Sequence, residues 1–188
     1  MTTQGLFAPA PARICSPMRA PYILFALLAA PVAAFAAGKT APPAAAGPKA
    51  IGTFGDWQAA TYPEGGQTVC YAFARAKTSA PALPGRGPVM LTVTQRASGR
   101  DAVSLSAGFA YAPNAGVKVA AEAVELDFYT AQRSAFARDG HAAVLAFEKA
   151  NQAVAHSPGP KGQAVTDTFS LRGFTAAYGA INKACPAK

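Results

Sequence analysis

Few side chains in this 188-residue sequence are of types that carry out chemistry. His141 and His156 could titrate, but a lone exposed histidine is more often a surface residue. Among the few carboxylates, Asp56 and Asp167 could belong to an acid–base pair of the glycosidase kind. Neither carboxylate lies in a recognisable motif, so we expect each to cap a turn or to pair with an arginine. The sequence contains no nucleophile elbow, zinc-protease helix, phosphate-binding loop or dinucleotide-binding glycine motif. We therefore predict no catalytic residues and no cofactor.

The cysteines point to a structural role rather than a reactive one. Cys15 falls in a segment that we expect to be removed, which leaves Cys70 and Cys185. In an exported protein an even pair of cysteines is more often bridged than free, although two buried thiols are the alternative. A Cys70–Cys185 disulfide would close a long loop and stabilise the fold by about 2–5 kcal/mol. Two histidines and two distant cysteines give no zinc-ligand spacing, so we expect no metal site.

The first 36 residues have the features of a secretory signal peptide. The apolar run from Tyr22 to Ala37 is shorter than the roughly 20 residues that span a bilayer. It contains the small-x-small pattern Ala34-Phe-Ala36, which predicts cleavage between Ala36 and Ala37. A start at Met18 would give a shorter and more typical signal. We expect a periplasmic or secreted protein without a transmembrane span after processing; the alternative is an uncleaved membrane anchor.

The rest of the chain has the pattern of one mainly β domain. Residues 37–50 are rich in alanine, proline and glycine and are expected to form a flexible linker, and residues 51–186 the folded domain. Short strands at regular spacing with two helices favour a β-sandwich, with the carboxy-terminal helix packed on it. We expect Tyr71, Phe73, Phe109 and Tyr111 to lie in the core. The strands are predicted at 51–61, 67–76, 89–94, 103–111, 117–119, 124–128, 152–156 and 165–169, and the helices at 140–150, after the N-cap Asp139, and from Phe174 to Cys185.

Several short segments, in a fixed order, resemble those of a known family. These are Phe54-Gly-Asp-Trp57, Cys70-Tyr-Ala-Phe73, Phe128-Tyr-Thr130, Ala135-Phe-Ala-Arg-Asp139, Thr166-Asp-Thr-Phe-Ser-Leu-Arg-Gly-Phe174 and the terminal Cys185. Together they resemble the invasion-associated locus B family of bacterial exported proteins. The resemblance implies a periplasmic or surface-associated protein with an immunoglobulin-like β-sandwich and no catalytic residues. Many members carry a further cysteine shortly after the tryptophan, where this sequence has Gln58-Ala-Ala60.

The charge balance suggests which partners the protein would bind. Lysine and arginine number 17 against 9 acidic residues, and loss of Arg13 and Arg19 with the signal lowers the net charge from +8 to +6. Such a charge favours an anionic envelope component, contacted by exposed bases such as Arg96, Arg100 and Lys118. Another envelope protein is a second candidate partner, and no nucleic acid is expected. The alternative functions are a periplasmic hydrolase, a carbohydrate-binding module, and an inhibitor or chaperone-like binder.

The signal peptide gives the first testable prediction. We expect the mature protein to begin at Ala37, within about three residues, because the peptidase recognises small residues after a short apolar run. Amino-terminal sequencing of protein released by osmotic shock measures this directly. Recovery of Met1 or Met18 from the membrane fraction would instead show an uncleaved anchor.

Overall fold

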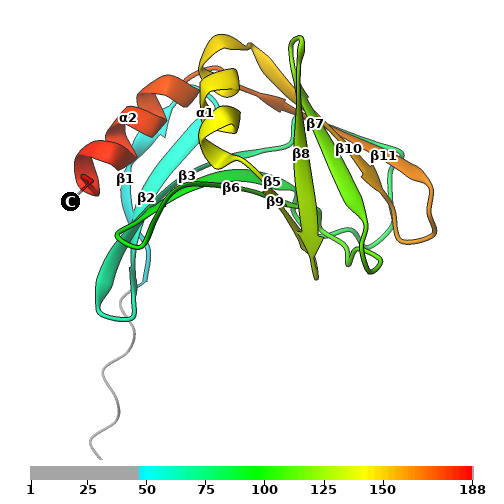
Figure 1. Cartoon of the computed structure of the whole chain (residues 1–188), viewed down its shortest axis with the longest axis horizontal. Helices are drawn as coiled ribbons and strands as arrows, with labels where there is room; N and C mark the ends of the chain where they lie inside the picture. Colours follow the sequence, from blue (N-terminus) through cyan, green and yellow to red (C-terminus); the bar gives the residue numbers. More distant parts are fainter. Residues whose placement is uncertain (1–46, 188) are drawn as a thin grey trace, which may run out of the picture. The chain divides into compact units, whose positions relative to one another are not determined.

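A computed structural model describes residues 47–187, so the predicted signal peptide, its cleavage site and most of the linker lie outside the described residues. In this part of the chain, eleven strands form one antiparallel sheet accompanied by two helices, which confirms the mainly β class (Figure 1). Because the strands are hydrogen-bonded into one sheet, the immunoglobulin-like sandwich stays a prediction. No helix within residues 47–187 has the length and apolar character needed to cross a membrane.

The elements follow one another along the chain in a simple order. The strands are β1 (Lys49–Phe54), β2 (Trp57–Glu64), β3 (Gln67–Arg75), β4 (Thr78–Ala80), β5 (Met90–Arg96), β6 (Gly99–Ser106), β7 (Gly116–Ala121), β8 (Val124–Ala131), β9 (Ser134–Ala137), β10 (Gln152–Pro158) and β11 (Ala164–Ser170). The helices are α1 (Gly140–Lys149), between β9 and β10, and α2 (Phe174–Ala184), after β11. Across the sheet the strand order is β1-β2-β3-β5-β6-β9-β8-β7-β10-β11-β4.

The sheet is bent so that its last strand, β4, returns to β3, the third strand of the order. Strand β3 pairs with β2 and β5 near one end of the strand order, whereas β4 pairs with β11 at the other end. Only residues 76 and 77 separate β3 from β4, and the Lys77 amide donates to the Thr168 carbonyl oxygen at 2.8 Å. The far end of the sheet must therefore return to β3, and both halves share one core.

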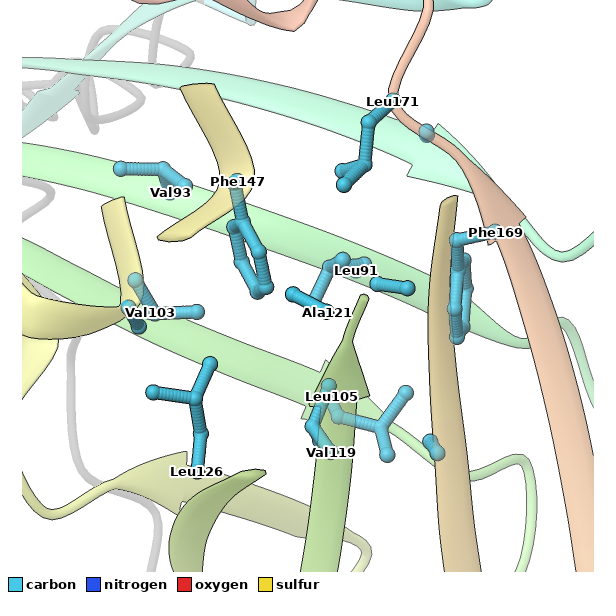
Figure 2. Close-up of a cluster of buried hydrophobic side chains, with 14 of the residues drawn as sticks. Leu91, Val93, Val103, Leu105, Val119, Ala121, Leu126, Phe147, Phe169 and Leu171 are labelled. Carbon is cyan, nitrogen blue, oxygen red and sulfur yellow. The ribbon is translucent and has the colours of Figure 1, made fainter. Parts of the chain in front are cut away.

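Both helices lie on the same side of strands β2, β3 and β6 (Figure 1). Trp57 is fully buried there, packs edge-on against Phe174 at 4.9 Å between ring centroids, and donates its indole N–H to the Ser170 carbonyl oxygen at 3.0 Å. Figure 2 shows Phe147 of α1 among side chains of both halves of the sheet, including Leu91 and Phe169. Burial of such side chains away from water is the main favourable term in folding.

Two predicted strands differ from the structure. The segment 51–61 is a hairpin, because Gly55 turns the chain with a φ of +59° and β1 then pairs back onto β2. A side chain at position 55 would also collide with the Arg172 carbonyl oxygen, 2.6 Å from where a Cβ would sit. The predicted strand 103–111 ends at Ser106, although Phe109 and Tyr111 continue into the core as expected.

The predicted ends of the helices agree closely with the structure. The Asp139 carboxylate accepts a hydrogen bond from the Ala142 amide at 2.9 Å, which confirms it as the N-cap of α1. Cys185 ends α2 and forms a disulfide with Cys70 on β3, with 6.0 Å between the two Cα atoms. The bridge fixes the end of α2 to the sheet, as the sequence predicted.

A buried ion pair lies between the long 81–89 loop and β11. The guanidinium of Arg86 donates to both oxygens of Asp167 at 2.8 and 2.7 Å, and the Asp167 side chain is fully buried. Arg86 also donates through Nε to the Ala107 carbonyl oxygen at 2.7 Å and lies 5.0 Å from the centre of the Phe109 ring. Its guanidinium thus joins the loop, β11 and the chain after β6.

We predict that Arg86→Met destabilises the fold by about 3–5 kcal/mol, because it leaves the Asp167 carboxylate buried without a partner. Denaturant unfolding monitored by tryptophan fluorescence measures the change. The matched control is Arg172→Met, which removes an exposed pair with Asp56 and should cost about 1 kcal/mol or less. Adding Asp167→Leu to Arg86→Met should restore part of the loss; equal effects of the two arginine variants would contradict this role.

Candidate functional site

The carboxylates that could have formed an acid–base pair are instead held in ion pairs, as predicted. Asp167 is enclosed with Arg86, and Asp56 accepts from Lys77 at 2.6 Å and from Arg172 at 3.2 Å. The hydrogen bonds from Lys77 and Arg172 hold the pKa of Asp56 well below its usual range. Asp56 is therefore ionised at neutral pH and has no proton to give as a general acid.

His141 belongs to a polar network centred on Asp101, at the β5–β6 hairpin. One oxygen of Asp101 accepts from the Tyr178 hydroxyl at 2.6 Å and from the Gln95 amide at 2.7 Å, and the other lies 2.9 Å from Nδ1 of His141. The first residue of α1, Gly140, sits so close that a Cβ there would be 1.8 Å from the Asp101 carbonyl oxygen. The network therefore fastens both helices to one hairpin.

The electrostatics of this network favour a charged carboxylate. Burial by itself raises the pKa of Asp101, but hydrogen bonds from Tyr178, Gln95 and His141 outweigh it and leave the pKa below its ordinary value. Burial, with the bond to Asp101, raises the pKa of Tyr178. His141 pairs with Asp101, which links the first turn of α1 to the β5–β6 hairpin.

The other predicted candidates lie apart from this network. His156 is on β10, where its Nδ1 is 3.3 Å from the Thr166 hydroxyl. Trp57 is buried in the core, which confirms the packing role expected of it. Across residues 47–187 no three side chains of histidine, cysteine, aspartate or glutamate come together as metal ligands.

The strongest candidate site is the side of the sheet away from the helices, where no helix of residues 47–187 lies (Figure 1). A row of directly paired residues crosses five strands there, from Phe73 through Thr92, Ser104 and Phe136 to Tyr129. Residues paired across an antiparallel sheet project on the same side, and four steps of about 4.8 Å give a row of roughly 19 Å. We call this surface the open face; it comprises the row and its neighbours Tyr71, Arg75, Met90, Thr94, Ser106 and Ser134.

Aromatic rings mark both ends of the open face. Tyr71 and Phe73 have ring centroids 6.0 Å apart with planes inclined by 30°, and Tyr129 and Phe136 have centroids 5.6 Å apart with planes inclined by 28°. The first pair separates two shallow hollows of about 270 and 280 Å³. The first hollow extends over β1 and β2, and the second is lined by Tyr71, Phe73, Arg75, Met90 and Thr92.

The centre of the open face is polar. Thr92, Ser104 and Ser106 are half-buried, so part of each side chain is exposed to solvent. The hydroxyls of the open face are therefore available to a ligand. A surface with aromatic ends and a hydroxyl-lined centre combines apolar contact with hydrogen bonding.

The bases expected to attract an anionic partner are largely occupied. Arg96 pairs with Glu64 at 2.7 Å, and Lys118 pairs with Asp127 at 2.7 Å and with Glu125 at 3.0 Å. Arg100 donates to the Cys185 carbonyl oxygen and to Asn182. Two other arginines, Arg75 and Arg138, form no ion pair within residues 47–187. Arg75 belongs to the open face, and Arg138 borders it, 5.9 Å from the centre of the Tyr129 ring.

The prediction that Tyr71 and Phe73 belong to the core is wrong. On β3 the core side is that of Cys70, Ala72 and Ala74, and the two aromatic residues project away from it, half-buried. Phe136 was missed as a site residue because β9 is only four residues long and was not predicted, and Tyr129 was missed because it follows the predicted end of its strand at residue 128. The sequence of β3 did contain a signal for an exposed aromatic surface, because this strand has apolar side chains on both sides although only one side can face the core.

Comparison with known proteins agrees with the fold. A family model described as invasion associated locus B (IalB) protein matches residues 57–182. The crystal structure of invasion associated protein b from Bartonella henselae is similar to the structure of this chain, with a TM-score of 0.51 and 16% sequence identity. The match covers 71% of this chain and 95% of that chain, and at this identity it shows the fold alone. A comparison with curated proteins gives no match.

The network around Asp101 predicts a particular dependence of stability on pH. Because the folded pKa is below the unfolded one, the unfolded state binds more protons in acid, and the stabilisation is present above about pH 4 and lost as the pH falls through the folded pKa. The free-energy difference between wild type and Asp101→Asn should therefore shrink at low pH, measured by denaturant unfolding across the acidic range. Asn tolerates the left-handed φ of +54° at this position. A difference independent of pH would contradict the assignment.

Proposed function

The chain belongs to the invasion associated locus B family, and from this premise we propose that it is an exported bacterial envelope protein that binds a partner through the open face. In this proposal the protein is not an enzyme and needs no cofactor. Its partner is a component of the envelope or of a surface that the bacterium meets, in keeping with the names of the family and of the Bartonella protein. The proposed location is the periplasm or the outside of the cell.

The observation that supports binding is the open face. Large apolar side chains are normally kept from water, yet here the side of the sheet opposite the helices presents Tyr129 at 46% exposure and half-buried Tyr71, Phe73 and Phe136. Exposed aromatic side chains that gather on one side of a sheet are typical of interaction sites, and here two aromatic pairs flank a hydroxyl-lined centre. The sheet beneath is held in register on its other side by the core, so the face is formed before any partner arrives.

The polar groups described above favour binding over catalysis. Asp56 and Asp167 are engaged in ion pairs, and His141 is engaged with Asp101. On the open face the side chains are aromatic rings, hydroxyls, a thioether and an arginine. These groups recognise a ligand well, and they include neither a carboxylate nor a histidine to move a proton.

A matched pair of substitutions tests the proposal. Thr92→Glu places a negative charge in the centre of the open face, and we expect it to lower retention by bacterial envelope fragments about tenfold in a sedimentation assay. Thr175→Glu introduces the same change in the first turn of α2, on the other side of the sheet, and should leave retention unchanged.

Raising the salt concentration should also weaken wild-type retention, because exposed charges are screened over about 8 Å at physiological ionic strength. Equal retention of the two glutamate variants would contradict binding through the open face. Turnover of a glycan, peptide or ester substrate by the purified protein would contradict a non-catalytic role.

A further inference from the structure

The open face has a composition that selects one class of ligand, and this inference rests on the proposed function. We infer that it binds an acidic glycan, a chain of sugar rings that carries carboxylate, sulfate or phosphate groups. The features that carry the inference are the two aromatic pairs, the hydroxyl row between them and the two arginines at its ends.

The aromatic pairs suit the apolar faces of sugar rings. A pyranose ring presents C–H groups on its flat sides, and these pack against aromatic faces in the way that other positively polarised groups do. Tyr71 and Phe73 border the hollow of about 280 Å³, which also contains Met90 and Thr92. That hollow offers one sugar ring an aromatic wall, a polarisable thioether and a hydroxyl.

The row between the aromatic pairs suits the hydroxyl groups of the same chain. Thr92 and Ser104 are directly paired across β5 and β6, and Ser106 is paired with Ser134 across β6 and β9. Each hydroxyl both donates and accepts, which matches the hydroxyl groups of a sugar. The row is about 19 Å long, so it accommodates several linked rings and not a single sugar.

The arginines add a requirement for negative charge. Arg75 lines the same hollow as Phe73, and Arg138 lies over Tyr129 at the other end of the row. Each guanidinium can donate two parallel hydrogen bonds to a carboxylate, sulfate or phosphate. Asp127 on β8 is paired with Lys118 at 2.7 Å; the hydrogen bond from Lys118, with a smaller contribution from the charge of Arg138, lowers the pKa of its carboxyl group.

A protein partner fits this surface less well. The centres of protein–protein interfaces are enriched in large aromatic, methionine and arginine side chains and depleted in serine, and their energetic hot spots seldom include serine or threonine. Here the aromatic residues are at the ends of the row, and the centre consists of Thr92 and Ser104. A nucleic acid fits poorly too, because the centre of the row has no lysine or arginine to follow a phosphate backbone.

The test uses the full mature chain and defined hexasaccharides: galacturonan, hyaluronan and sulfated heparin fragments as acidic probes, and cellohexaose as the neutral one. Isothermal titration calorimetry should detect at least one acidic hexasaccharide with Kd below about 1 mM, and cellohexaose should bind more weakly. Tyr129→Ala and Phe73→Ala should each weaken binding about tenfold. Arg75→Gln should weaken it and reduce its dependence on salt.

Two control variants remove similar groups elsewhere. Leu145→Ala deletes a side chain on α1 that is 43% exposed, close to the 46% of Tyr129, and Lys149→Gln removes one positive charge at the end of α1. Both should bind as the wild type does. Because Tyr129 is exposed, its replacement leaves the core intact, and an unchanged thermal midpoint verifies this.

The inference is wrong if no acidic hexasaccharide binds below about 1 mM, or if Tyr129→Ala and Phe73→Ala bind as tightly as the controls. Treating the envelope fragments with protease or with periodate distinguishes this failure from failure of the proposed function. Retention that remains sensitive to Thr92→Glu but is abolished by protease, and not by periodate oxidation of sugars, would identify a protein partner and leave binding through the open face standing.

Discussion

The buried ion pair between Arg86 and Asp167 is the constraint on which the closure of the sheet depends. Asp167 is in the middle of β11, directly opposite Ser79 of β4, so its carboxylate lies where the last two strands of the sheet meet. An isolated carboxylate in the interior is strongly unfavourable, so the 81–89 loop must bring Arg86 to it. The same guanidinium holds the Ala107 carbonyl oxygen, which positions the chain as it leaves β6 towards Phe109 and Tyr111. One side chain thus joins segments that are distant in the sequence.

The packing of α2 on the sheet explains why the large aromatic residues of β3 face outward. Small side chains, Ala59 of β2 and Ala72 and Ala74 of β3, occupy the side towards the helices. They allow α2 to approach the strands closely, and Trp57 and Phe174 fill the remaining space. A tyrosine or phenylalanine at these positions would push the helix away and break the close packing of the interior. The bulky residues are therefore left on the opposite side, where they form the open face.

The sequence predicted the parts of the fold that follow from local pattern. The alternation of residues in β10 and β11, the Asp139 cap and the pairing of Cys70 with Cys185 were all predictable, because each depends on residue type and spacing alone. The turn at Gly55 was missed, because its need for glycine comes from contact with Arg172, far along the chain. The direction of Tyr71 and Phe73 was missed because both sides of β3 are apolar. The row from Phe73 to Tyr129 depends on the pairing of five strands, and sequence pattern does not reveal which strands are neighbours.

The β5–β6 hairpin connects the two sides of the molecule. Towards the helices it carries Asp101, which holds Tyr178 of α2 and His141 of α1, and on the other side it carries Thr92 and Ser104 of the open face. The inward residues Leu91, Val93, Val103 and Leu105 are almost completely buried, so a slip of one residue in register would expose all of them. The register that protects the core therefore also sets the spacing of the hydroxyls and rings on the open face. On the proposal that the open face binds a ligand, little conformational entropy would be lost on binding, because the core already fixes that spacing.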